Sequence, residues 1–108
     1  MNKEIESFVD KFIFPVAHKF ECDVEYAARN KEVLPEEEVA GFLRLSLMRS
    51  IEDLSATLIG SGASKESISE IVKGFANGGR DFIESKGLPP VKLDSFGMVF
   101  GVKKVRGK

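Results

Sequence analysis

The chain has 108 residues, of which 43% are hydrophobic and 31% are charged, and its formal net charge is −1. This composition is typical of one folded domain, and the single cysteine, Cys22, excludes an internal disulfide framework and a cysteine-rich metal site. Charged residues interrupt the first 15 positions, and no uncharged stretch is long enough to cross a membrane. We therefore expect a cytoplasmic protein with no membrane contact.

The charge is distributed unevenly along the chain. Residues 88–108 contain five Lys or Arg and one Asp, a net charge of +4, whereas residues 1–87 contain eleven Lys or Arg and sixteen Asp or Glu, a net charge of −5. A basic tail on an acidic body indicates contact with an acidic partner, with the chain's own oligomer or with phosphate, and a tail that only keeps the chain soluble is the alternative. We divide the chain into a helical domain, residues 1–87, and a basic segment, residues 88–108, that packs on it or on a partner.

The first predicted element is a helix over residues 3–30, in which apolar residues recur every three or four positions. Pro15 lies inside this pattern. Proline removes one backbone hydrogen bond and collides with the carbonyl group of Lys11. We expect the helix to be kinked or split there, with Pro15 in the first turn of a second helical piece.

The second helix is predicted to start at Pro35, after a connection over residues 31–35. Proline suits a first helical turn, and the carboxylates of Glu36, Glu37 and Glu38 favour the positive end of the helix dipole. Its apolar face continues to Leu58, and the sequence Gly-Ser-Gly at residues 60–62 is expected to end it.

A third helix is expected after Ser64, whose side chain suits the N-cap position. Its apolar residues continue to Ile83, but three glycines, Gly74, Gly78 and Gly79, interrupt them at a cost of about 1 kcal/mol each relative to alanine. Either the helix breaks near Gly78, or the glycines permit a close approach by a neighbouring helix.

The last segment has a different periodicity. Residues 96–103 alternate between large apolar side chains and other residues, which predicts a β-strand, and residues 91–93 are a candidate partner strand in a hairpin. A two-stranded ribbon is only marginally stable alone, so it must pack on the helices, pair with a second copy or add to a partner's sheet. The predicted fold is therefore a mainly α, three-helix domain with a short C-terminal strand or hairpin.

The segment Gly62–Gly74 resembles the turn and recognition helix of the repressor-type helix-turn-helix family. In that family a Gly-small-Ser turn caps a helix with an Ile-Ser-x-Ile core, and a glycine follows one turn later. The resemblance covers 13 of the 108 residues. The chain departs from the pattern upstream, where Ser61 and Leu58 occupy positions at which the family has an apolar residue and an alanine.

The resemblance implies DNA binding, with Lys65, Ser69 and Lys73 facing the major groove and the basic tail contacting phosphates. Glu66 and Glu70 would face the groove as well, and phosphates repel carboxylates. An amphipathic helix with a serine cap produces the same pattern without DNA.

Other candidate sites are few. Gly78, Gly79 and Arg80 form a glycine-rich segment that suits a small anion, and the alternative is a helix break or a tight helix crossing. His18 lies four residues from Cys22, which permits a Cys–His pair but supplies no third group to orient the histidine. We therefore expect no catalytic site, no metal and no cofactor.

The leading hypothesis is a non-catalytic protein that binds a protein partner as a regulator, adaptor or inhibitor. Nine phenylalanines are many for a three-helix core, so we expect apolar surface to be shared in a homo-oligomer, either a dimer or a larger assembly. DNA binding is the alternative. The residues expected to bind the partner lie on the predicted strand and beside it: Phe96, Met98, Phe100, Lys103, Lys104 and Arg106.

Overall fold

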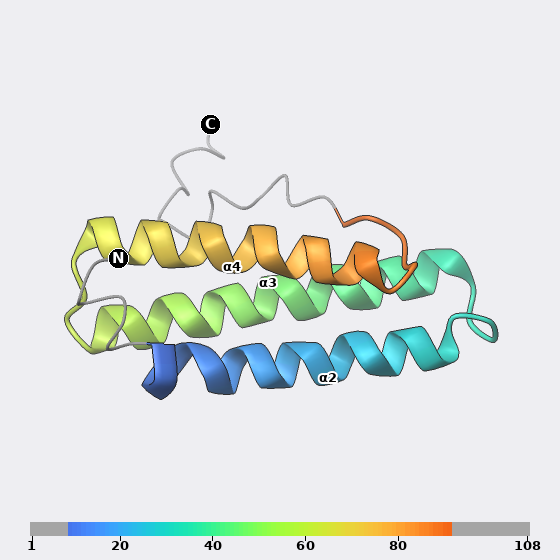
Figure 1. The fold of residues 1–108 in the computed structure, drawn as a ribbon, viewed down its shortest axis with the longest axis horizontal. Coiled ribbons are helices and arrows are strands. Elements are labelled where there is room, and N and C mark those ends of the chain that lie inside the picture. Colours follow the sequence, from blue (N-terminus) through green and yellow to red (C-terminus); the bar gives the residue numbers. More distant parts are fainter. Residues whose placement is uncertain (1–8, 92–108) are drawn as a thin grey trace.

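The computed structural model describes residues 9–91, in which three α-helices lie side by side (Figure 1). A π-helical turn, η1 (Val9–Ile13), leads into α2 (Phe14–Asn30), and α3 (Glu36–Gly60) and α4 (Lys65–Ser85) follow. Helix α3 runs opposite to α2 and α4. The three predicted helices are confirmed, and no strand occurs within the described range. None of the described helices is long and apolar enough to span a membrane.

The first predicted helix changes its hydrogen bonding next to Pro15. The turn η1 has the wider π-helical pattern, α2 begins at Phe14, and Pro15 lies in the first turn of α2. At this position the missing backbone N–H of proline removes no α-helical bond. The chain is therefore divided into two helical pieces next to Pro15, as predicted. The second piece follows the first directly, and the hydrogen bonding changes from π-helical to α-helical between them.

The connections between the helices are short and have regular caps. Pro35 is the N-cap of α3, with an extended backbone, and three glutamates fill the first turn. Between α3 and α4, Gly62 has a φ of 83°, which favours glycine. Ser64 caps α4 because its Oγ accepts a hydrogen bond from the backbone N–H of Ser67 at 3.1 Å. These connections place α2 and α4 in the same direction, each packed on α3.

Helix α3 supplies the largest share of the core. Its buried apolar face faces both neighbouring helices, and Leu43, Leu47, Leu54 and Leu58 have no exposed surface. A buried polar contact adds to the α2–α3 interface, where Ser46 Oγ donates to Asp23 Oδ2 at 2.7 Å. The core is thus a layer of aliphatic side chains between α3 and the two outer helices.

The glycines of α4 have different surroundings. The helix is continuous through all three, so the first of the two alternatives, a break near Gly78, does not occur. A Cβ atom on Gly79 would lie 2.9 Å from Leu47 Cδ1 and 3.3 Å from Phe20 Cε2, whereas one on Gly74 or Gly78 would meet nothing within 4 Å. The alternative of a close helix approach is therefore correct at Gly79, and this packing requires glycine at that position only.

The chain turns back over the bundle after α4. Gly87 has a φ of 72° and ends the helical region, and Leu88 and Val91 are both buried against the core. The start of the basic segment therefore packs on the helical domain. The predicted strand over residues 96–103 lies outside the described residues, as do the partner strand beyond Val91 and the candidate binding residues Phe96 to Arg106.

Candidate functional site

An apolar groove runs between α2 and α4 on one face of the bundle. Its volume is about 300 Å³, and it is open to solvent. The two helices that border it run in the same direction (Figure 1). The residues that line the groove are Ala17, Phe20, Glu21, Phe75, Gly78, Gly79 and Phe82.

Aromatic rings form most of the groove. Phe20 is 2% exposed and packs edge-to-face on Phe75, with ring centroids 5.8 Å apart and an interplanar angle of 61°. Phe75 and Phe82 are half-buried and line the α4 side. Phe14 lies one turn before Ala17 on the same side of α2 and is 60% exposed, so it extends the apolar surface along the helix.

The two glycines of the groove shape it in opposite ways. Gly79 allows α4 to approach Phe20 and Leu47 closely, as the Cβ distances above show. Gly78 is exposed, and the space above its Cα holds no side chain. Gly79 thus lets the helices come together at the floor of the groove, and Gly78 leaves the space above that floor open.

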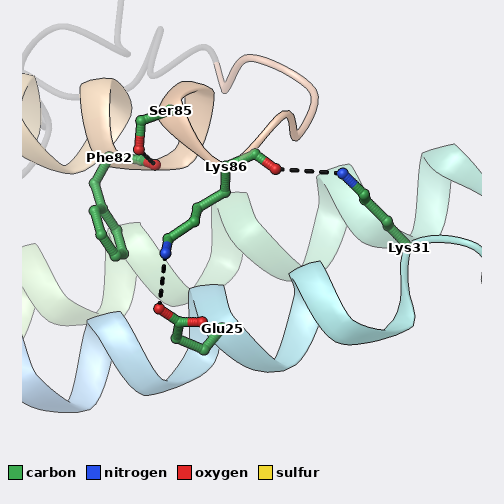
Figure 2. A network of polar contacts seen from close by, with 5 residues as sticks. All are labelled: Glu25, Lys31, Phe82, Ser85 and Lys86. Atoms are coloured by element: carbon green, nitrogen blue, oxygen red, sulfur yellow. Dashed lines mark hydrogen bonds and ion pairs between the residues drawn. The ribbon is translucent and has the colours of Figure 1, made fainter.

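A polar network joins α2 and α4 at one end of this groove (Figure 2). Lys86 Nζ lies 3.0 Å from Glu25 Oε2 and 5.2 Å from the centroid of the Phe82 ring. Lys31 Nζ donates to the backbone oxygen of Lys86 at 3.3 Å, and Ser85 Oγ donates to the backbone oxygen of Phe82 at 2.7 Å. The ion pair between Lys86 and Glu25 thus links the end of α4 to α2.

The lining of the groove contains one charged side chain, and it is a carboxylate. Glu21 lies in the lining and is exposed, and Glu25 lies one turn further along the same helix. Lys86 forms an ion pair with Glu25, and Lys31 Nζ donates to the backbone oxygen of Lys86, so both cations of this end are engaged outside the lining. The charge of Glu21 therefore favours an occupant that combines apolar and basic side chains.

The residues of the helix-turn-helix resemblance share one open strip of α4. Lys65, Ser69 and Lys73 line a shallow surface together with Glu66 and Glu70, so the two charges of each sign cancel. Helix α4 lies antiparallel along α3 (Figure 1), whereas the two helices of a helix-turn-helix cross at a steep angle. The structure thus brings the three residues together on an electrically neutral strip of a helical hairpin.

The glycine-rich segment at residues 78–80 does not form an anion-binding loop. It lies inside α4, where backbone N–H groups bond to carbonyl groups of the preceding turn. The guanidinium of Arg80 donates from Nη2 to Asn77 Oδ1 at 2.7 Å. Backbone donors and the arginine therefore do not converge on one point in the way that an anion site requires.

His18 and Cys22 lie on the exposed side of α2, with Nε2 and Sγ 3.8 Å apart. No cluster of three or more His, Cys, Asp or Glu side chains that would hold a metal ion occurs in the described part of the chain. The pair is thus a contact between neighbouring turns of one helix.

Sequence reasoning did not identify the groove. Its signal was present as phenylalanines on both sides of Gly78-Gly79, but periodicity assigned Phe20, Phe75 and Phe82 to a core without showing which of them stay accessible. Comparison with protein-family models, with curated proteins and with solved structures finds no match to this chain.

Proposed function

We propose that the chain is a non-catalytic protein that binds a protein partner and acts as a small regulator, adaptor or inhibitor. The observation that carries the proposal is the open aromatic groove between α2 and α4. Aromatic residues are enriched at protein interfaces, and binding hot spots cluster in apolar pockets. A partner segment whose apolar side chains enter the groove, and whose basic residue meets Glu21, fits both its lining and its charge.

Two further parts of the proposal concern the tail and the oligomeric state. Phe96, Met98 and Phe100, with Lys103, Lys104 and Arg106, are proposed as additional partner contacts, because this segment combines apolar and basic residues. A homo-oligomer is proposed because exposed apolar side chains such as Phe14 remain on the described surface. Light scattering at about 100 µM tests the homo-oligomer, since a dissociation constant (Kd) in the µM range would give mainly oligomer at that concentration. A monodisperse monomer would exclude the homo-oligomer.

DNA binding stays the alternative proposal. The exposed position of Lys65 and Lys73 on one strip of α4 favours it, but Glu66 and Glu70 on the same strip oppose it. The groove is lined by three aromatic side chains, whereas the strip carries charges of both signs, so we place protein binding first.

A matched pair of variants tests the groove. Gly78→Arg places a long side chain over the aromatic floor, and it is expected to fold because a Cβ at Gly78 meets no atom. Ala56→Arg adds the same side chain at an exposed position of α3 and serves as the control. Proteins that cross-link to the wild-type chain in its host should also cross-link to the control and should be lost with Gly78→Arg.

The partner found in this way is then purified and titrated calorimetrically against all three chains. We expect the affinity for Gly78→Arg to fall by at least about tenfold, or 1.4 kcal/mol, with no change for Ala56→Arg. Equal affinities for the three chains would contradict binding through the groove.

A further inference from the structure

We infer that residues 92–108 of the same chain dock in the α2–α4 groove and cover it until a partner displaces them. The inference rests on the proposed function, because it assigns a competitor to the groove through which the partner would bind.

The body and the tail carry opposite charges. Residues 9–91 contain ten Lys or Arg and fourteen Asp or Glu, a net charge of −4, and residues 92–108 contain five Lys or Arg and one Asp, a net charge of +4. At the groove itself, the exposed carboxylate of Glu21 lies in the lining. Electrostatic attraction therefore brings the tail toward the body and favours an orientation with a basic residue beside Glu21.

The apolar residues of the tail match the lining of the groove. Phe96, Met98 and Phe100 alternate with smaller or shorter residues, so in an extended segment they share one side at a spacing of about 6.6 Å. Aromatic rings pack favourably on other rings, and methionine sulfur makes favourable contacts with aromatic edges. The rings of Phe75 and Phe82 offer such contacts from the groove.

The tail begins close to the body and is long enough to reach the groove. Val91, the last described residue, is buried, so the tail is tethered at the surface of the bundle. Seventeen extended residues span about 56 Å, whereas α3, the longest helix with 25 residues, is about 37 Å long. Attachment to the same chain gives an effective concentration on the order of millimolar, so even weak intrinsic contacts would hold the tail in place.

Two other hollows lie near the start of the tail and fit it less well. One is lined by Glu37, Ala40, Gly41 and Arg44 beside Pro90 and Val91, so its two charges have opposite signs. The other is lined by Lys31, Glu32, Glu36 and Val39 beside Gly87, Leu88 and Pro89. Neither lining contains an aromatic side chain, so the α2–α4 groove is the hollow that suits the aromatic residues of the tail.

Paramagnetic relaxation in the full-length chain tests the inference. Cys22→Ser removes the native thiol, and Gly101→Cys places a nitroxide label next to Phe100 without replacing a proposed contact. We expect the amide signals of Glu21, Gly78 and Phe82 to lose most of their intensity, and those of Ala56 on the outer face of α3 to keep it. Unchanged groove signals, or equal losses at Ala56, would overturn the inference.

Two controls separate this result from its alternatives. A mixture of isotope-labelled chain without nitroxide and unlabelled chain with nitroxide should show no broadening of the groove signals. Broadening of those signals in the mixture would place the tail in the groove of a second copy and would overturn docking within one chain. In the labelled chain, Glu21→Lys should restore the groove signals, whereas Glu52→Lys, at an exposed position of α3, should not. Restoration by both, or by neither, would contradict the charge argument.

The inference and the proposed function fail in different ways. If the groove signals are unaffected by the label but Gly78→Arg abolishes partner binding, the tail does not dock and the partner groove stands. If the signals are broadened but Gly78→Arg leaves partner affinity unchanged, the tail docks and the groove is not the partner site.

Discussion

Alanine substitutions at the three glycines of α4 have effects of opposite sign on stability. In an exposed helix interior, replacing glycine by alanine stabilises by about 1 kcal/mol, because the unfolded chain loses conformational freedom. Gly74 and Gly78 have free space where the methyl group would lie. For a domain of about 100 residues, 1 kcal/mol raises the Tm by roughly 4–8 °C.

Gly79→Ala has the same favourable effect on the unfolded chain, but a steric cost in the folded state outweighs it. The new methyl group would lie 2.9 Å from Leu47 Cδ1 and 3.3 Å from Phe20 Cε2, and both side chains are buried. Forcing an extra methyl group into a packed core costs about 1–3 kcal/mol. The net effect is a loss of about 0–2 kcal/mol, so the Tm is expected to fall, while it rises for the other two variants.

Urea unfolding followed by far-ultraviolet circular dichroism measures the three differences. A double-mutant cycle with Leu47→Ala isolates the contact, because truncating Leu47 removes the Cδ1 atom that the new methyl group would meet. In that background Gly79→Ala should be less destabilising than in the wild-type chain, since only the contact with Phe20 at 3.3 Å remains. The reasoning is refuted if Gly79→Ala stabilises the wild-type chain as much as Gly78→Ala does, since α4 would then not approach α3 closely at this point.

Three further predictions follow from the caps, the ion pair and the charged strip. Ser64→Ala should lower the free energy of unfolding in urea by about 0.5–2 kcal/mol, because it removes the N-cap acceptor of α4, and no change would contradict the capping. Lys86→Met breaks the partly exposed ion pair with Glu25, so the free energy of unfolding should fall by at most about 1 kcal/mol, and by less at high salt. A decrease several times larger in the same assay would contradict a weak surface pair. Fluorescence anisotropy with duplex DNA distinguishes the alternative function: charge reversal at Lys65 and Lys73 should abolish a salt-sensitive DNA signal if this strip binds DNA and should leave partner binding through the groove unchanged.

The sequence was sufficient for the helices but not for their contacts. Apolar periodicity predicted the three helices, and local chemistry predicted the change at Pro15, the start of α3 after Pro35 and the cap at Ser64. The alternatives for Gly78 and Gly79 stayed open because the backbone freedom of glycine suits a break and a close approach equally well. Only the position of Leu47 and Phe20, which comes from packing, decides between them.

The groove was hidden for a related reason. Periodicity shows which side of a helix is apolar, but it does not show which two helices share that side. Short connections bring α2 and α4 onto the same neighbour in the same direction, and only then do Phe20, Phe75 and Phe82 converge. Phe20 is buried there and the other two stay accessible, although all three have the same spacing pattern in the sequence.

Gly78 links the stability of the bundle to the proposed binding. Gly79 is explained by packing, but nothing in the described fold requires glycine at the preceding position, where alanine has room and would stabilise the helix by about 1 kcal/mol. Proteins commonly keep a destabilising residue where function needs open surface. A side chain at Gly78 would project into the groove and reduce access to the rings of Phe75 and Phe82. If the groove binds a partner as proposed, glycine at this point keeps the aromatic surface accessible at the expense of helix stability.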